Sequence, residues 1–158
     1  MKKPRPQAPA DAPSGTVQLG GFIGWFSLSL HVTSDDLKPE VISTLFGIGP
    51  TASQSKDVPL MGADGKVKRV PKFGRWTLCI KSAETDEWDI EEVILALLAR
   101  LPSEVSIWRD VARCGATHLS VGLSLTTPNE SFSLEPTLLA FLGERGIGVS
   151  FDVYDKDF

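Results

Sequence analysis

Four stretches of the chain alternate large apolar side chains with small or polar ones, and this period of two limits the fold more than any other feature. Successive side chains of a β-strand point to opposite faces, so the alternation predicts strands with one apolar face each. The predicted strands lie at residues 22–32, 76–81, 118–125 and 149–154. Because none has a continuous apolar run, we expect helices to cover one side of a sheet and the other side to stay open.

Helical patterns fill the segments between these strands. Apolar residues recur at helical spacing after residues that can start a helix, either as a proline in the first turn or as a capping side chain. The expected start residues are Pro39, Asp89, Ser103 and Ser133. Glycines that favour a helix end follow three of these segments, namely Gly47, Gly115 and Gly146.

The order of elements predicts an α+β fold. It resembles a ferredoxin-like βαββαβ unit with an extra αβ step, with a mainly antiparallel sheet, helices packed on one face and the other face open. Residues 1–15 are rich in proline and have no large apolar side chain beyond Met1, so we expect a disordered tail. Residues 16–158 are of a length that fits a single domain.

Charge is distributed unevenly along the chain. The net charge is −4, but residues 56–75 carry six cations against two acids, for a local charge of +4. The first fifteen residues carry +2, which leaves −10 on the remainder. Within 56–75, two short segments flank Ala63-Asp64-Gly65, and a glycine at such a turn predicts a hairpin. A basic hairpin therefore projects from an acidic body.

The basic hairpin is the first candidate binding site. Its residues are Lys56, Lys66, Lys68, Arg69, Lys72, Arg75 and, at its base, Trp76. Clustered cations attract phosphates or a carboxylate-rich surface, and an indole can stack on a base. The alternative interpretation is that the lysines protect an exposed strand edge from pairing and bind nothing.

The open sheet face is the second candidate site. Its candidate residues are Ser29, His31, Cys79, His118, Ser120, Asp152 and Tyr154. If the first strand and the His118 strand are antiparallel neighbours, the two histidines come close together on this face. The alternative is a hydrated sheet surface with short polar side chains.

No complete catalytic or metal-binding motif is present in the sequence. A nucleophile elbow of the Gly-x-Ser-x-Gly kind is absent, and Gly20-Gly21 precedes a predicted strand instead of opening a helix. Two histidines do not complete a zinc site, which takes three or four ligands. Cys79 and Cys114 lie 35 residues apart without a redox motif. We therefore expect no catalytic residue, no metal and no cofactor.

Several features predict a cytoplasmic protein. The two cysteines lie within regular apolar patterns and are expected as reduced thiols. No stretch approaches the roughly 18 apolar residues of a membrane span, and the Met-Lys-Lys-Pro start leads into prolines instead of a signal core.

Short motifs along the chain resemble one known family. They are Gly47-Ile48-Gly49-Pro50-Thr51, Lys56-Asp57, Lys72-Phe73-Gly74-Arg75-Trp76, and Leu142 with Phe151-Asp152-Val153-Tyr154. In order and spacing these resemble the bacterial family called domain of unknown function 4279, from about residue 22 to 154. The Lys-Gly-Asp expected in the middle loop stands here as Lys56-Asp57. The resemblance implies a small bacterial domain without an assigned activity, and it implies no catalytic residues.

Three functional hypotheses follow. The first is a non-catalytic domain that uses its acidic body or its open sheet face to bind a protein partner or a second copy of itself, with an immunity-protein role by analogy. The second is a binder of anionic ligands or nucleic acid that uses the basic hairpin. The third is an enzyme that uses His31, His118 and Asp152 on the open face.

Overall fold

The computed structural model describes residues 23–81, 89–125 and 132–154. The predicted tail at residues 1–15 lies outside the described residues. The strands are β1 (Ile23–Ser34), β2 (Ala52–Gln54), β3 (Leu60–Met61), β4 (Val67–Arg69), β5 (Gly74–Lys81), β6 (Ala116–Leu125) and β7 (Ile147–Tyr154). The helices within these ranges are α1 (Pro39–Phe46), α2 (Ile90–Leu98), α3 (Val105–Cys114) and α4 (Pro136–Glu144).

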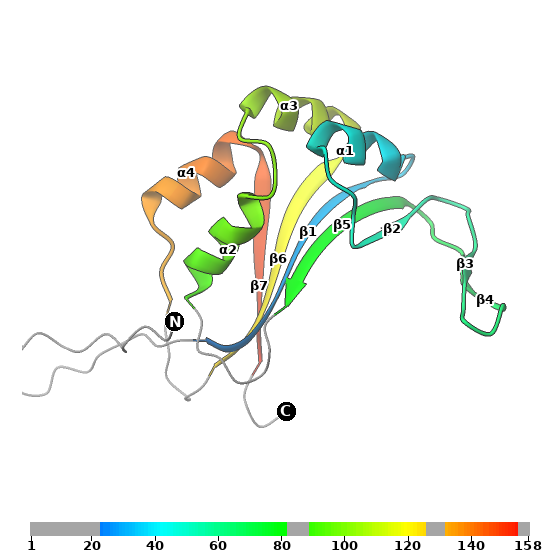
Figure 1. The fold of residues 1–158 in the computed structure, drawn as a ribbon, viewed down its shortest axis with the longest axis horizontal. Helices are drawn as coiled ribbons and strands as arrows, with labels where there is room; N and C mark the ends of the chain where they lie inside the picture. Colours follow the sequence, from blue (N-terminus) through cyan, green and yellow to red (C-terminus); the bar gives the residue numbers. More distant parts are fainter. Residues whose placement is uncertain (1–22, 82–88, 126–131, 155–158) are drawn as a thin grey trace, which may run out of the picture.

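The larger sheet has five strands in the order β2-β5-β1-β6-β7. Strand β1 pairs antiparallel with both β5 and β6, and β2 pairs antiparallel with β5. Only the β6–β7 pair is parallel among the described strands, and α4 makes the crossover that a parallel pair needs. The four helices lie on one side of this sheet (Figure 1). The structure confirms a mixed α+β fold with a mainly antiparallel sheet.

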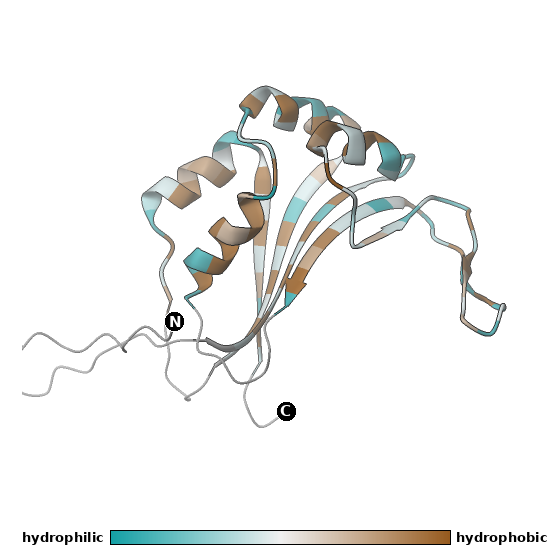
Figure 2. Ribbon diagram, in the orientation of Figure 1, coloured by the Kyte–Doolittle hydropathy of each residue, from teal (hydrophilic) through white to brown (hydrophobic). Residues whose placement is uncertain are grey.

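The core lies between the sheet and the helices. The apolar residues of the alternating strands point toward the helices, and Leu30 in the central strand β1 is 0% exposed. Figure 2 shows the alternation as brown and pale bands along the strands. From the helix layer, the ring of Phe46 lies 5.3 Å from that of Trp76 and 4.9 Å from that of Trp108. Three aromatic rings therefore join α1 and α3 to β5.

Two of the four expected helix starts are confirmed. Pro39 lies in the first turn of α1, and the Asp89 carboxylate accepts hydrogen bonds from the backbone N–H groups of the first turn of α2. The prediction for Ser133 is wrong, because Pro136 holds Glu135 in an extended conformation and the helix begins only after it. Ser103 is also not a cap, since α3 begins at Val105. Within the described residues no helix is long and apolar enough to cross a membrane.

The predicted hairpin is present as the two-stranded β3–β4 sheet. Its turn is closed by a hydrogen bond from Gly62 N to Lys66 O of 2.8 Å, and Gly65 has a φ of 71°, which favours glycine. The hairpin extends from the end of the sheet toward the side that faces away from the helices (Figure 1). It therefore stands beside the open face.

Candidate binding surface

The side of the larger sheet away from the helices carries polar side chains in register. His31 lies opposite Thr77 on one neighbouring strand and opposite His118 on the other. Ser29 likewise lies opposite Cys79 and Ser120, and the row continues to Ser150 of β7. Asp152 and Tyr154 both lie on this side of β7, where they are opposite Gly122 and Ser124 of β6. The pairing confirms that the predicted residues share one face and that the histidines are neighbours; their role in binding stays a prediction.

Both histidines are held by hydroxyl groups. His31 Nδ1 lies 3.0 Å from Thr77 Oγ1, and His118 Nε2 lies 2.9 Å from Ser150 Oγ. Burial lowers the pKa of His31 below its ordinary value of 6.5, and the positive charges of Arg75 and His118 lower the pKa further. Protonation of His31 at the centre of the face is therefore disfavoured, and a negative charge nearby would make it less unfavourable.

An aromatic pair closes the end of the face toward the C-terminus of β7. The rings of Trp25 and Tyr154 meet edge to face with their centroids 6.3 Å apart. Both rings lie beside Gly122, where an added Cβ atom would be 3.7 Å from each of them, an ordinary contact distance. Trp25 was not among the residues predicted for this face, although its parity along β1 is that of Ser27 and Ser29 and places it there.

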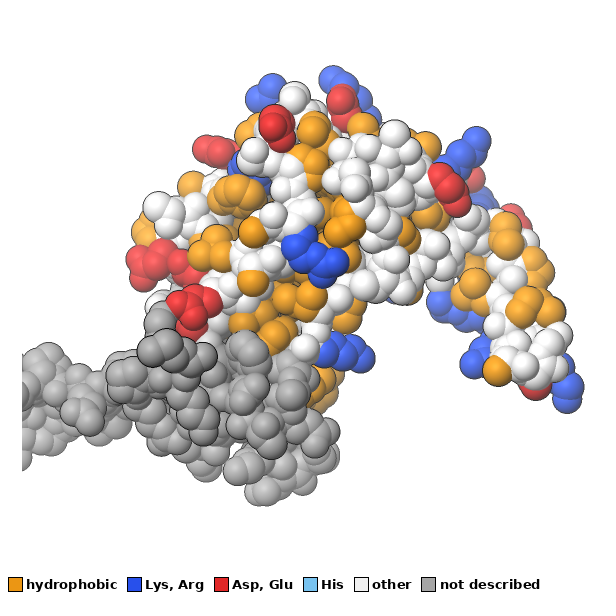
Figure 3. Space-filling view, in the orientation of Figure 1, with side chains coloured by type: hydrophobic (Ala, Val, Ile, Leu, Met, Phe, Trp, Pro, Cys, Tyr) orange, Lys and Arg blue, Asp and Glu red, His pale blue; other side chains and the backbone are white. Residues whose placement is uncertain are grey.

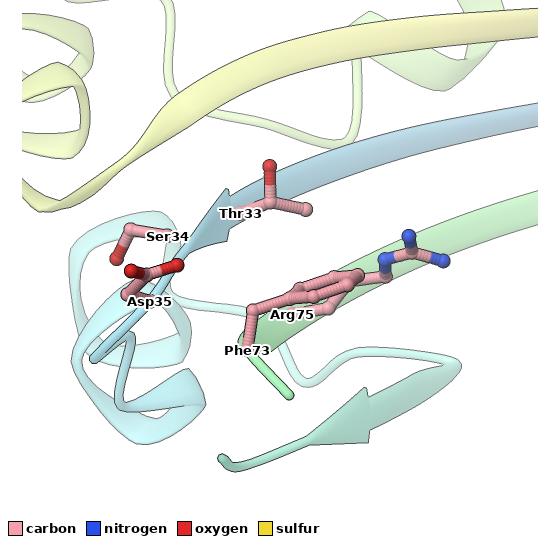
Figure 4. Close-up of a pocket in the computed structure, with 5 residues that line it drawn as sticks. All are labelled: Thr33, Ser34, Asp35, Phe73 and Arg75. Atoms are coloured by element: carbon pink, nitrogen blue, oxygen red, sulfur yellow. The ribbon is translucent and has the colours of Figure 1, made fainter. Parts of the chain in front are cut away.

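A small pocket lies at the opposite end, where β1 ends and β5 begins. It is lined by Thr33, Ser34, Asp35, Phe73 and Arg75 and has a volume of about 250 Å³. In Figure 4 the Phe73 ring and the Arg75 side chain lie side by side, and the guanidinium carbon is 5.1 Å from the ring centroid. Ligand pockets usually measure roughly 300–1,000 Å³. The volume of this pocket is below that range, so it is too small to hold a larger ligand by itself. We regard it as an extension of the open face.

The cations predicted for the hairpin divide into three groups. Lys56 forms an ion pair with Asp36 at 3.6 Å, and Arg69 donates a hydrogen bond to the Gln54 side chain. Arg75 belongs to the open face, as its parity with Thr77 and Cys79 along β5 predicts. The remaining three are exposed and have no side-chain partner among the described residues: Lys66, Lys68 and Lys72.

The hairpin and the body enclose a hollow. Figure 3 shows a recess between them, with Lys and Arg side chains along the inner edge of the hairpin. On the sheet itself Lys81 and Asp152 contribute opposite charges. The positive charge at this side of the molecule therefore comes mainly from the hairpin and Arg75.

Trp76 does not belong to the site. It is 0% exposed, packs against Phe46, and donates a hydrogen bond from Nε1 to Ser43 Oγ at 3.0 Å. Its parity along β5 points it toward the helices, because it alternates with the open-face residues Arg75 and Thr77. The prediction that Trp76 stacks on a base or ring is wrong, since no ligand reaches a side chain in the core.

Each hydroxyl–imidazole contact resembles the nucleophile and the base of a catalytic triad, but no third residue completes a triad among the described residues. In a triad an acid orients the second nitrogen of the histidine. Among the described residues no carboxylate hydrogen-bonds Nδ1 of His118, and a side chain at Gly148 would lie 3.0 Å from that nitrogen. No group of three or more His, Cys, Asp or Glu side chains in the described ranges is placed to hold a metal ion.

The comparisons with known proteins agree with the motifs in the sequence. The sequence model of the family described as Domain of unknown function (DUF4279) matches residues 25–156. That range includes the open face, the hairpin and β7. Neither a curated protein nor a solved structure matches the chain. Because the match covers most of the sequence, the chain belongs to the DUF4279 family.

Proposed function

We propose that this domain binds an acidic segment of a partner protein in the hollow formed by the open sheet face and the β3–β4 hairpin. The observation that carries the proposal is the position of Lys66, Lys68 and Lys72 on or directly after the hairpin, beside the face that no described helix covers. All three are exposed and have no side-chain partner within the described ranges. The immunity-protein hypothesis is the case in which the partner is a toxin.

Electrostatics supports an acidic partner. The hairpin segment carries +4, and Arg75 extends this charge onto the sheet, where it already disfavours protonation of His31. A carboxylate brought near would be attracted by the lysines and would offset the repulsion at the histidines. The hydroxyl groups of the face supply hydrogen-bond partners for a peptide.

A protein partner is favoured over nucleic acid for two reasons. Single-stranded nucleic acid is usually held by exposed aromatic rings close to the cations, but Trp76 at the base of the hairpin is buried, and the Trp25–Tyr154 pair lies at the end of the face opposite Arg75. The chain outside the hairpin and the first fifteen residues carries −10, which repels a long polyanion.

The free thiols Cys79 and Cys114 support a reducing compartment, and we place the protein in the cytoplasm as part of this proposal.

The test is a titration of the full chain against a fluorescein-labelled oligoglutamate peptide, followed by fluorescence anisotropy at low and at moderate salt. We expect binding that weakens as salt rises. The triple variant Lys66→Glu/Lys68→Glu/Lys72→Glu should lower the affinity at least about tenfold, because three attractive contacts become repulsive.

The matched control is Lys38→Glu/Arg100→Glu/Arg109→Glu, which reverses three exposed cations outside the hairpin and changes the net charge equally. It should keep the affinity within about twofold, since these sites are distant rim charges. An equal loss in both variants would mean that overall charge governs binding and would overturn the proposal. A labelled single-stranded oligonucleotide that binds more tightly than the peptide, and through the same lysines, would replace it with the nucleic-acid hypothesis. If neither probe binds, the proposal is wrong, and protection of the strand edge is the remaining explanation for the lysines.

A further inference from the structure

Strand β7 has an unpaired edge with exposed apolar side chains. It is the last strand of the sheet, so one edge pairs with β6 and the other pairs with no described residue. Phe151 is 36% exposed and Val153 is 53% exposed, although both point to the side of the helices. Figure 1 shows that the C-terminal end of β7 extends past α2 and α4. The Phe151 ring also packs against the Phe132 ring of the same chain, with the centroids 4.9 Å apart. The described residues therefore cover this apolar end of the sheet only in part, and Val153 stays the more exposed of the two side chains.

The edge also lacks the usual protection against pairing. Natural edge strands are commonly short or carry lysine or proline. Strand β7 has eight residues, and its one charged side chain is Asp152. The N–H and C=O groups of its outer edge pair with no described strand. They are a template for another strand, and main-chain hydrogen bonds then supply affinity.

We propose that β7 pairs antiparallel with β7 of a second copy, so that two sheets join into one. Two identical antiparallel strands are related by a two-fold axis perpendicular to the sheet, and one residue must then lie opposite its own copy. That residue is Phe151. The other opposed pairs are Val149 with Val153, Ser150 with Asp152, and Gly148 with Tyr154.

This register matches the chemistry of every position. On the helix side, Phe151 meets Phe151 and the valines meet each other, which removes exposed apolar surface from water. On the open side, the carboxylate of Asp152 faces a hydroxyl. The Tyr154 ring covers Gly148, which has no side chain of its own to pack, and aromatic side chains stabilise glycines at strand edges in this way.

The neighbouring registers are worse. With Asp152 on the axis, two carboxylates lie directly opposite each other, which is destabilising. With Ser150 on the axis, Tyr154 faces Gly146, which precedes the strand, so the exposed ring is left without a paired strand. The Phe151 register alone of these three pairs the apolar end and separates the charges.

The symmetry has a consequence for the open face. A two-fold axis perpendicular to the sheet keeps both helix layers on one side and both hairpins on the other. The dimer interface shares Asp152 and Tyr154 with the open face but no residue of the hairpin. The lysine variants above and the Val153→Lys variant below therefore test the two proposals separately.

The first experiment measures the mass of the full chain by sedimentation equilibrium. We expect a dimer, and Val153→Lys should raise its dissociation constant more than about tenfold, because the substitution puts an unpaired cation inside the interface. The matched control is Val41→Lys, at a valine of α1 that is 43% exposed, which should leave the constant unchanged. A monomeric wild-type chain, or a dimer insensitive to Val153→Lys, overturns the proposal.

The second experiment tests the register in a Cys79→Ser/Cys114→Ser background. Opposed residues of an antiparallel pair have Cα atoms about 4.5–5.5 Å apart, within disulfide range. Phe151→Cys should therefore form a disulfide with its own copy under oxidation. Val153→Cys should not, because its copy lies about 13 Å away along the strand, but it should cross-link when mixed with Val149→Cys. Cross-linking of Val153→Cys to itself in preference to Phe151→Cys overturns this register.

Discussion

The two faces of the larger sheet are built from the same strands and have opposite properties. In β1, Leu30 is 0% exposed against the helices, whereas its neighbours Ser29 and His31 are partly exposed on the other side. The helix side is held by close packing and the open side by a few hydrogen bonds between hydroxyl and imidazole groups. Stability therefore depends mainly on the helix side of each strand, and the proposed binding on the open side, so substitutions on the two faces should separate them.

The largest expected difference is between Leu30→Ala and Ser29→Ala, which change adjacent residues of one strand. Leu30→Ala should lower the free energy of unfolding by about 2–5 kcal/mol, because it leaves a cavity in the core. Ser29→Ala should change it by less than about 0.5 kcal/mol, since it removes a small, partly exposed side chain that has no hydrogen-bond partner among the residues the structure describes. Urea unfolding followed by circular dichroism measures both. Similar losses for the two variants would contradict the division between the faces.

A smaller effect is expected at Gly74, where β5 begins beneath the loop after β1. A Cβ atom at this position would lie 2.3 Å from the carbonyl oxygen of Leu37, so backbone has to move. Gly74→Ala should destabilise the protein by about 1–3 kcal/mol in the same urea assay. Gly49→Ala is the control, because nothing lies within 4 Å of its added Cβ, and it should change stability by less than about 0.5 kcal/mol. Equal effects would mean that close packing does not reach this end of the sheet.

The smallest effect concerns protons on the open face. The pKa of His31 is lowered in the folded protein by burial and by Arg75, so the unfolded chain takes up a proton at this residue more readily. The free energy of unfolding should then fall as the pH drops below about 6.5 and level off beneath the folded pKa.

Comparing the wild type with His31→Gln at a series of pH values from neutral to mildly acidic isolates this contribution. The loss of the hydrogen bond to Thr77 adds an offset that does not depend on pH. A stability difference that stays constant over this range would show that the open face does not resist protonation at His31.

Local chemistry predicted several parts of this structure. The start of α1 at Pro39, the cap at Asp89 and the turn at Gly65 each depend on a residue and its immediate neighbours, and all three are present. Sequence parity also predicted the contact between His31 and His118 once the two strands were assumed to pair. The start of α4 was misplaced because Pro136, three residues after the expected cap, restricts the residue before it.

The sequence by itself determined which side chains share a face, because alternation along a strand is a property of the backbone alone. Only the tertiary structure decided that the β3–β4 hairpin lies beside the open face, and that Phe151 and Val153 stay exposed although they lie on the helix side of β7. These features depend on where helices end relative to strands and on which strand stands at the edge. Both are set by packing between segments far apart in the chain, and no local pattern encodes them.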